Sequence, residues 1–163
     1  MNRRHAQGLL LGALAAPTLA ARGQTAATLA PDVDLPGSSV AARLSDLRGR
    51  LVYLDFWASW CGPCRLSFPW MNQLHAAHQA RGLVVLAVNL DARRADADAF
   101  LARQPARFSL AFDAGAESAR RFAIKGMPSS ALIDRQGLLL FMHRGFRPDD
   151  GPALEARIVA ALA

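Results

Sequence analysis

Two runs of the chain are hydrophobic at almost every position, and the stretch between them is hydrophobic only at helical spacing. Residues 51–57 (LVYLDFW) and 83–90 (LVVLAVNL) are rich in aliphatic and β-branched side chains, as is typical of strands buried on both faces. Between them, residues 64–80 space their hydrophobic side chains as a helix does and end at Arg81–Gly82, a helix stop. The pattern predicts a β-α-β unit whose helix should kink at Pro69, because proline lacks a backbone N–H.

Strand and helix patterns continue to alternate along the rest of the chain. Parallel strands need crossovers with helices on the sheet faces, so the alternation predicts an α/β fold, a three-layer sandwich with a mixed central sheet. No linker or internal repeat interrupts residues 31–163, and we expect one domain there. The expected elements are a helix over 91–104, a strand around 108–112, a short helix over 116–122, a hairpin of strands 130–133 and 138–141, and a closing helix over 152–161.

The N-terminus has the pattern of an export signal. Arg3 and Arg4 precede an uncharged stretch over residues 8–20. That stretch is shorter than the roughly 20 apolar residues that a membrane-spanning helix needs. We therefore predict a cleavable signal peptide over residues 1–20, a short N-terminal segment over 21–30, and a periplasmic location. An uncleaved membrane anchor and a buried N-terminal helix are the alternatives.

Composition favours a packed fold and argues against nucleic-acid binding. Hydrophobic residues make up 52% and charged residues 20% of the 163 residues, unlike the polar composition of disordered chains. The net charge is +6, but all except one of the 19 basic residues are arginines scattered among acidic residues. Because no basic run reaches about five residues, the sequence has no stripe that would track a phosphate backbone. We predict no nucleic-acid partner.

The two cysteines of the chain, Cys61 and Cys64, carry the candidate chemistry. They lie where a predicted strand gives way to a predicted helix, and the start of a helix stabilises a thiolate, whose pKa can then fall from about 8.5. Their spacing suits the roughly 4.4–6.8 Å between Cα atoms that a disulfide requires. We predict that Cys61 is the nucleophile and that Cys64, more buried, releases the mixed disulfide by attacking Cys61.

Three other uses of the cysteine pair compete with disulfide exchange. A static disulfide over so short a loop would stabilise the fold little. Zinc needs four ligands, and the chain has no second cysteine pair, while His75 and His78 are expected on a solvated helix face. Two thiolates can hold copper(I), so a copper(I)-binding metallochaperone is the alternative function. For disulfide exchange we predict neither a metal site nor a cofactor.

Residues 55–65 (DFWASWCGPCR) resemble the active-site segment of the thioredoxin superfamily, and Gly126–Ser129 (GMPS) is similar to its cis-proline loop. The resemblance implies that Pro128 lies opposite the cysteines. If Pro128 is cis, the Met127 backbone is left free to pair with an extended partner segment. The rim that would contact a partner then consists of Trp60, Gly62, Pro63, Met127, Gly145 and Phe146.

Three further segments resemble the exported TlpA/ResA-type branch of that superfamily: residues 30–36, residues 44–49, and an extra helix and strand between Asp91 and Asp113. The resemblance implies a thioredoxin-like domain over residues 31–163 with a helix-strand insertion. It also implies partners, since that branch keeps cysteines of exported proteins reduced, including those of apocytochromes c or copper-site proteins.

Asp55 is a carboxylic acid in an otherwise apolar predicted strand. Burial disfavours the charged form, so we expect a raised pKa and a role as general base for the Cys64 thiol, with a purely structural role as the alternative. Ala87 stands where thioredoxins usually carry a lysine, which makes burial the dominant effect on Asp55. Ser67 stands where the TlpA/ResA-type branch often has glutamate, so that residue's acid-base role cannot be carried over. We expect His143, on the last strand, to be structural.

The Gly62–Pro63 insert between the cysteines matches that of reducing thioredoxins, which have potentials near −270 mV, against about −120 mV for the strong oxidant DsbA. We therefore predict a protein-disulfide reductase that acts as a monomer on exported proteins. Such a reductase needs re-reduction, so a membrane protein that delivers electrons from the cytosol is an expected partner. A peroxiredoxin is not expected, because Ala58 stands where those enzymes resemble Thr-x-x-Cys.

Overall fold

The computed structural model describes residues 28–163. The predicted signal peptide over residues 1–20 and the first part of the segment over 21–30 lie outside the described residues. From Thr28 onward the chain lies against the end of the sheet: the Thr28 carbonyl accepts a hydrogen bond from the Leu139 amide, and the Ala30 amide donates one to the Gly137 carbonyl. In the described part of the chain, no helix is both long and apolar enough to cross a membrane.

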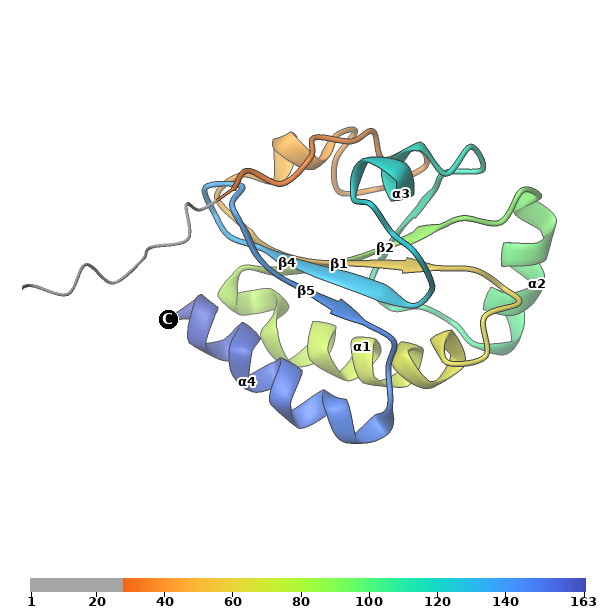
Figure 1. Cartoon of the computed structure of the whole chain (residues 1–163). Coiled ribbons are helices and arrows are strands. Elements are labelled where there is room, and N and C mark those ends of the chain that lie inside the picture. Colours follow the sequence, from red (N-terminus) through yellow and green to blue (C-terminus); the bar gives the residue numbers. More distant parts are fainter. Residues whose placement is uncertain (1–27) are drawn as a thin grey trace, which may run out of the picture.

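A five-stranded mixed sheet forms the middle of the molecule (Figure 1). The strand order is β3-β2-β1-β4-β5, with β1, β2 and β3 parallel, β4 antiparallel to β1, and β5 antiparallel to β4. The predicted mixed sheet is therefore confirmed, and the predicted insertion supplies a helix and the edge strand β3. The strands are β1 Leu51–Trp57, β2 Leu83–Asn89, β3 Ser109–Phe112, β4 Ser129–Ile133 and β5 Leu139–Arg144.

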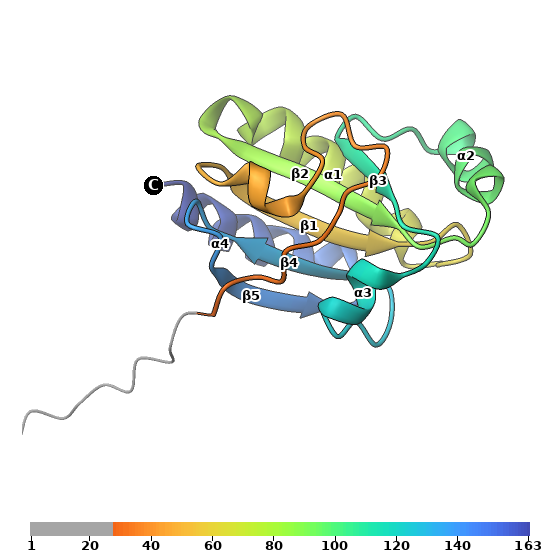
Figure 2. The same cartoon turned by 90° about the horizontal axis from the view of Figure 1, so that it is seen from above.

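Helices cover both faces of this sheet and complete the three layers (Figures 1 and 2). Helices α1 and α4 lie against one face, and α2 joins the same core through its buried side chains. Helix α3 and the N-terminal segment pack on the opposite face. The helices are α1 Cys64–His78, α2 Arg94–Arg103, α3 Glu117–Arg121 and α4 Gly151–Leu162, with 3-10 turns η1 Leu44–Leu47, η2 Gln79–Arg81 and η3 Pro148–Asp150.

Helix α1 continues through Pro69 without interruption. Proline has no N–H to donate to the carbonyl four residues earlier, which is that of Arg65. The side-chain amide of Gln104, just after α2, donates to this carbonyl at 2.5 Å. Gln104 thus supplies the hydrogen bond that the Arg65 carbonyl cannot receive from Pro69. The contact also joins the end of α2 to the first turn of α1.

Two predictions about element ends and side-chain exposure were wrong. Strand β5 runs through Met142 and on to Arg144, whereas the predicted strand ended at residue 141; an edge strand tolerates polar residues such as His143 and Arg144. His78 does not lie on a solvated face: it is buried, and its Nε2 lies 2.7 Å from a carboxylate oxygen of Glu155 on α4. This bond links the end of α1 to α4.

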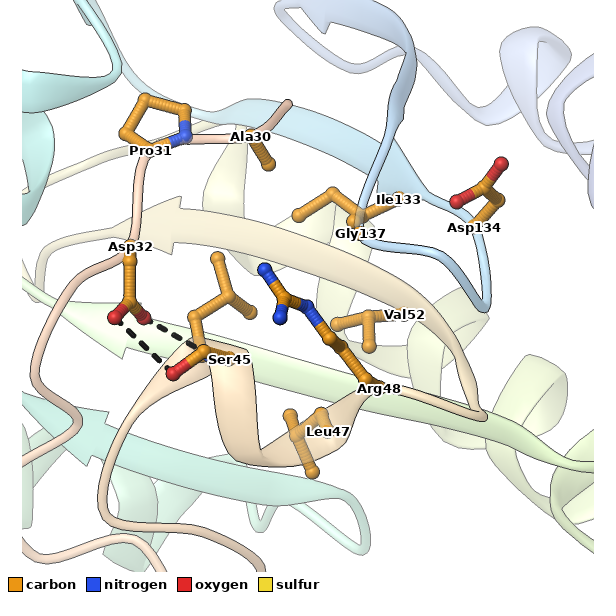
Figure 3. Close-up of a pocket in the computed structure, with 11 residues that line it drawn as sticks. Ala30, Pro31, Asp32, Ser45, Leu47, Arg48, Val52, Ile133, Asp134 and Gly137 are labelled. Atoms are coloured by element: carbon orange, nitrogen blue, oxygen red, sulfur yellow. Dashed lines mark hydrogen bonds between the residues drawn. The ribbon is translucent and has the colours of Figure 1, made fainter. Parts of the chain in front are cut away.

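A small cavity of about 30 Å³ lies on the sheet face away from α1, beneath the N-terminal segment (Figure 3). Asp32 at its edge accepts hydrogen bonds from the backbone amide and the hydroxyl of Ser45. The Arg48 side chain extends over the strand beside it. A space of this size suits one water molecule and no larger ligand, so this cavity is not a candidate functional site.

Candidate active site at Cys61 and Cys64

Cys61 and Cys64 lie between the end of β1 and the first turn of α1, as predicted. They form a disulfide with Cα atoms 5.3 Å apart. Cys61 is 4% exposed, whereas Cys64 is fully buried. Of the two cysteines, only Cys61 therefore keeps any contact with solvent.

The start of α1 supports negative charge on Cys61. The backbone N–H of Cys64 points at Cys61 Sγ, with a nitrogen-to-sulfur distance of 3.2 Å. This amide belongs to the first turn of the helix, where backbone donors have no helical acceptor. Such donors, with the helix dipole, lower the pKa of a nearby thiol. In the reduced protein we therefore expect the Cys61 thiolate to be stabilised.

Asp91 holds the loop that leads to Cys61, a role that the sequence analysis missed. Its buried carboxylate accepts hydrogen bonds from the backbone amide of Ser59 at 2.9 Å, from the Ser59 hydroxyl at 2.9 Å and from the Asn89 side chain at 2.8 Å. These contacts also explain why α2 begins at Arg94 and not at residue 91. The sequence signal for this role was the pair of polar residues Asn89 and Asp91 at the carboxyl end of the buried parallel strand β2.

An aromatic cluster lies in the same core as the cysteine pair. Trp57, at the end of β1, packs against Phe68 of α1 and Phe100 of α2, with ring centroids 4.8 and 4.9 Å apart. Phe68 also contacts Phe108, at 5.2 Å between centroids. Two of these three contacts, those of Phe68 with Trp57 and with Phe108, are edge-to-face. Because such contacts have preferred geometries, the cluster fixes the position of α1 relative to the sheet.

The Met127–Pro128 peptide bond is cis, as the resemblance implied. Ser129 pairs with Phe56 in the antiparallel strand β1. Pro128, the residue before Ser129, therefore lies at the end of β1, where the cysteine loop begins. The Gly145 amide donates to the Pro128 carbonyl at 2.8 Å. Met127 packs against the core cluster that contains both cysteines, and its backbone makes no hydrogen bond to any of residues 28–163.

The predicted contact rim is only partly gathered into one surface. A groove beside the cysteine loop joins Pro63, Gly145 and Phe146 of the prediction, and it adds Leu66, which the sequence analysis did not single out. Trp60 is 71% exposed and stands outside this groove, as do Gly62 and Met127. The groove is lined by Pro63, Leu66, His143, Arg144, Gly145, Phe146, Arg147 and Asp150.

Asp55 is buried, and burial raises the pKa of its carboxyl well above the usual range. Its neighbours across the sheet are Ala87 in β2 and Ser130 in β4, so no cation opposes it there. The expectation that burial dominates is therefore confirmed. Side chains alternate along a strand, so Asp55 faces the same side as Tyr53 and Trp57, which is the side of both cysteines.

Ser67 and the acidic groups near the site offer little for metal binding. The Ser67 hydroxyl is buried and donates to the Cys64 carbonyl at 3.1 Å, which is a structural use of the position. Within residues 28–163, no cluster of three or more His, Cys, Asp or Glu side chains is arranged to hold a metal ion. A copper(I) ion at this site would depend on the two cysteines alone.

The fold is a thioredoxin-like α/β fold, and its cysteine pair occupies the end of the first central strand. The sequence model of the AhpC/TSA family matches residues 26–142, and the chain belongs to this family. A crystal structure from Chlorobium tepidum, provisionally named thiol:disulfide interchange protein DsbE, is 56% identical, with a TM-score of 0.81 over 84% of this chain and 97% of that chain.

Two further relatives are more distant. A solution structure from Bacteroides thetaiotaomicron, provisionally named a protein disulfide isomerase, is 26% identical over 82% of this chain and 87% of that chain, with a TM-score of 0.73. Thiol-disulfide oxidoreductase ResA of Bacillus thuringiensis subsp. konkukian is 31% identical over 112 residues, which is 69% of this chain and 64% of the relative. The match thus spans less than two thirds of that curated relative.

Proposed function

We propose that this protein is a thiol-disulfide oxidoreductase that reduces disulfides in partner proteins through Cys61 and Cys64. The observation that carries the proposal is the asymmetry of the pair. Cys61 is slightly exposed and its sulfur accepts a hydrogen bond from a helix N–H, while Cys64, joined to it in the disulfide, is fully buried. The names of the relatives in Chlorobium tepidum and Bacillus thuringiensis support the same class of reaction.

The cycle starts from the reduced pair. The Cys61 thiolate attacks one sulfur of the partner's disulfide, so a Cys61–partner bond forms and the partner's other sulfur leaves as a thiolate. Cys64 then loses its proton and attacks Cys61 Sγ. The second partner sulfur is released, and the Cys61–Cys64 disulfide remains. Two electrons have passed from this protein to the partner.

Asp55 is the proposed general base for the second step. A carboxyl whose pKa is raised by burial lies closer to the pKa of a thiol than an exposed one does, which suits proton transfer from Cys64. Asp55 faces the cysteine side of the sheet, and no other acid is buried on β1. Pro128 would hold the facing loop, and the free Met127 backbone would pair with the partner chain.

Partner contact is assigned to the rim of Trp60, Gly62, Pro63, Met127 and Gly145. Trp60 exposes a large apolar surface next to Cys61 in the sequence, and exposed Leu66 adds apolar surface in the groove, where the buried Phe146 forms part of the lining. Exposed apolar surface of this kind is enriched at protein contacts. We further infer an exported, monomeric protein in the periplasm, a cleaved signal peptide over residues 1–20, and re-reduction by a membrane thiol reductase, with substrates of the cytochrome c or copper-site type.

One pair of assays separates this proposal from copper transport. The purified protein is tested for reduction of insulin disulfides and for a measured equilibrium potential with glutathione, and in parallel for copper(I) competition against a chelator. Disulfide reduction with a potential nearer −270 mV than −120 mV is expected. Tight copper(I) binding with negligible exchange would replace the proposal with a metallochaperone.

Trapping identifies the partners directly. A Cys64→Ala variant retains Cys61 but cannot release the mixed disulfide, so it should accumulate partner adducts when expressed with its own export signal. The matched control is Cys61→Ala, which leaves only the fully buried Cys64 and should trap nothing. Mass spectrometry of the adducts names the substrates, and their absence from the Cys64→Ala sample would count against exchange.

A further inference from the structure

Strand register places three polar side chains in one row across the sheet. Asp55 in β1 is paired with Ser130 in β4, and Ser130 is in turn paired with His143 in β5. Directly opposed residues in antiparallel strands have their side chains on the same face, with Cβ atoms about 4.5–5.5 Å apart. The row therefore runs on the sheet face that packs against α1 and α4, from the buried acid in β1 to the edge strand β5.

Hydroxyl groups occupy the middle of this row. The Tyr53 hydroxyl donates to Ser130 Oγ at 2.9 Å, and both groups are buried. Burial, with a smaller contribution from the Asp55 charge, raises the pKa of Tyr53, so its hydroxyl stays protonated. Ser130 accepts this bond and keeps its own proton to donate toward either neighbour in the row.

Both ends of the row have a polar atom with no hydrogen-bond partner among residues 28–163: Asp55 Oδ2 and His143 Nε2. The His143 side chain is 28% exposed and lines the groove beside Pro63. Its Nε2 lies 3.6 Å from Asp150 Oδ2, beyond hydrogen-bond distance. One end of the row is thus sealed in the core. At the other end His143 Nε2 is itself buried, while the rest of the partly exposed side chain lines the groove next to the cysteine loop.

We propose that the row Asp55–Ser130–His143 carries the proton of Cys64 from the core to the groove, with His143 as its outer end. The inference rests on the proposed function. His143 touches neither sulfur. It is therefore a positioning residue that acts through Asp55, by receiving the proton that Asp55 takes from Cys64. This assigns a role to a histidine that was expected to be structural.

The proton balance follows the second step of the cycle. Cys64 gives its proton to the Asp55 carboxylate, its sulfur bonds to Cys61 Sγ, and the Cys61–partner bond breaks to release a thiolate. Protonated Asp55 passes a proton toward Ser130, Ser130 passes its own toward His143, and His143 releases one to water in the groove. Asp55 returns to the carboxylate, ready for the next cycle.

Several other charged or titratable groups lie around the row. Asp150 of η3 is the acid nearest to His143, and Arg144 and Arg147 line the same groove. Pro63, just before α1, and Leu66 of α1 contribute only apolar surface to that groove. On the core side, Tyr53 and the cysteine pair are the titratable groups on the face of Asp55, and Ala87 of β2 adds none.

The test uses the reduced full-length mature chain, mixed in a stopped-flow instrument with 5,5′-dithiobis(2-nitrobenzoate). The first equivalent of coloured thiolate reports attack by Cys61, the second reports attack by Cys64, and a pH indicator follows the released proton. In His143→Gln we expect an unchanged first phase and a second phase slowed about tenfold, with the proton released equally late. Added imidazole should restore the second phase.

The matched control is His75→Gln, the same change at a partly buried histidine on α1 outside the row. It should leave both phases unchanged. The double variant Asp55→Asn/His143→Gln should be no slower than Asp55→Asn alone, because the relay is already cut. A normal second phase in His143→Gln, or equal slowing of both phases without imidazole rescue, overturns the relay. If the unmodified protein shows no second phase, the proposed function fails as well.

Discussion

On one face of the sheet, β1 contributes Tyr53, Asp55 and Trp57 to a core that also holds both cysteines. On the other face, the same strand contributes Val52, Leu54 and Phe56 to a core closed by α3 and the N-terminal segment. Both faces are buried to the same degree, but only the first includes an acid. The comparison shows how one strand supports packing and chemistry at alternate positions.

The cost of this arrangement falls on the cysteine face. A buried carboxyl without a hydrogen-bond partner at one oxygen is unfavourable for folding, and Asp55 is such a carboxyl on the face of the sheet that carries both cysteines. The apolar face has no such penalty and stabilises the sheet. Substitutions on the two faces should therefore affect activity and stability differently.

Cys61→Ser should have the largest effect, and only on exchange. Serine is a far weaker nucleophile than a thiolate, so insulin reduction should fall about a thousandfold or more. The fold should persist, because a bond across so short a loop constrains the unfolded chain little. The variant should unfold in denaturant at the same midpoint as the reduced parent protein. Retention of a tenth of the activity would remove Cys61 from the mechanism.

A matched pair of phenylalanines compares the two faces directly. Phe56→Ala opens a cavity against Phe122 on the apolar face, and Phe68→Ala opens one against Trp57 on the cysteine face. Each should cost about 3–5 kcal/mol in equilibrium unfolding. Only Phe68→Ala should change the alkylation rate of Cys61 in the folded protein. Equal changes in the Cys61 alkylation rate in both variants would mean that packing on the apolar face also affects the cysteine site.

Asp55→Asn should slow the second phase of exchange by about ten- to a hundredfold while sparing the first. It should also change stability with pH. The folded pKa of Asp55 lies above its ordinary value of 3.8, so as pH rises from about 4 the unfolded state loses this proton before the native state does. Unfolding is thereby favoured, and the parent protein loses stability that the variant keeps.

Urea denaturation of the oxidised forms across that pH range measures the effect. The stability advantage of Asp55→Asn should widen as pH rises toward the folded pKa of the acid. Ala87→Leu, a buried apolar change at the paired position of β2, is the control and should show no comparable pH dependence. A constant gap between Asp55→Asn and the parent would mean that the acid titrates normally.

Arg43→Ala should have the smallest effect. Arg43 forms ion pairs with Asp32 and Asp34 that fasten the N-terminal segment over the apolar face, but all three side chains are well exposed. Exposed pairs contribute about 1 kcal/mol or less, and salt screens them. Equilibrium unfolding should show a loss of that size that shrinks in high salt, with no change in exchange rate. A slower exchange rate in Arg43→Ala would mean that the N-terminal segment on the apolar face affects the cysteine site.

The central strands and the cysteine motif could be predicted from the sequence because each depends on local information. The runs at residues 51–57 and 83–90 are apolar on both faces, and the helix start at Cys64 follows directly from the strand before it. Contacts between distant segments could not be predicted in the same way. Asp91 reaches back to Ser59, and Gln104 reaches back to Arg65, and neither pattern is visible in the local sequence.

The position of His143 could not be predicted from the local sequence either. Its place in a row with Asp55 depends on the register of two antiparallel pairings, which a single sequence does not fix. The end of β5 was predicted too early for a related reason: the strand includes the polar residues His143 and Arg144, which still pair with β4.

The acidity of Cys61 tests the account most directly. In the reduced Cys64→Ala variant, the rate of iodoacetamide alkylation is measured against pH, with the same variant unfolded in urea as the reference. The helix N–H at Cys61 Sγ predicts a folded pKa at least about one unit below the value of about 8.5 for free cysteine. Identical profiles for the folded and unfolded protein would contradict it.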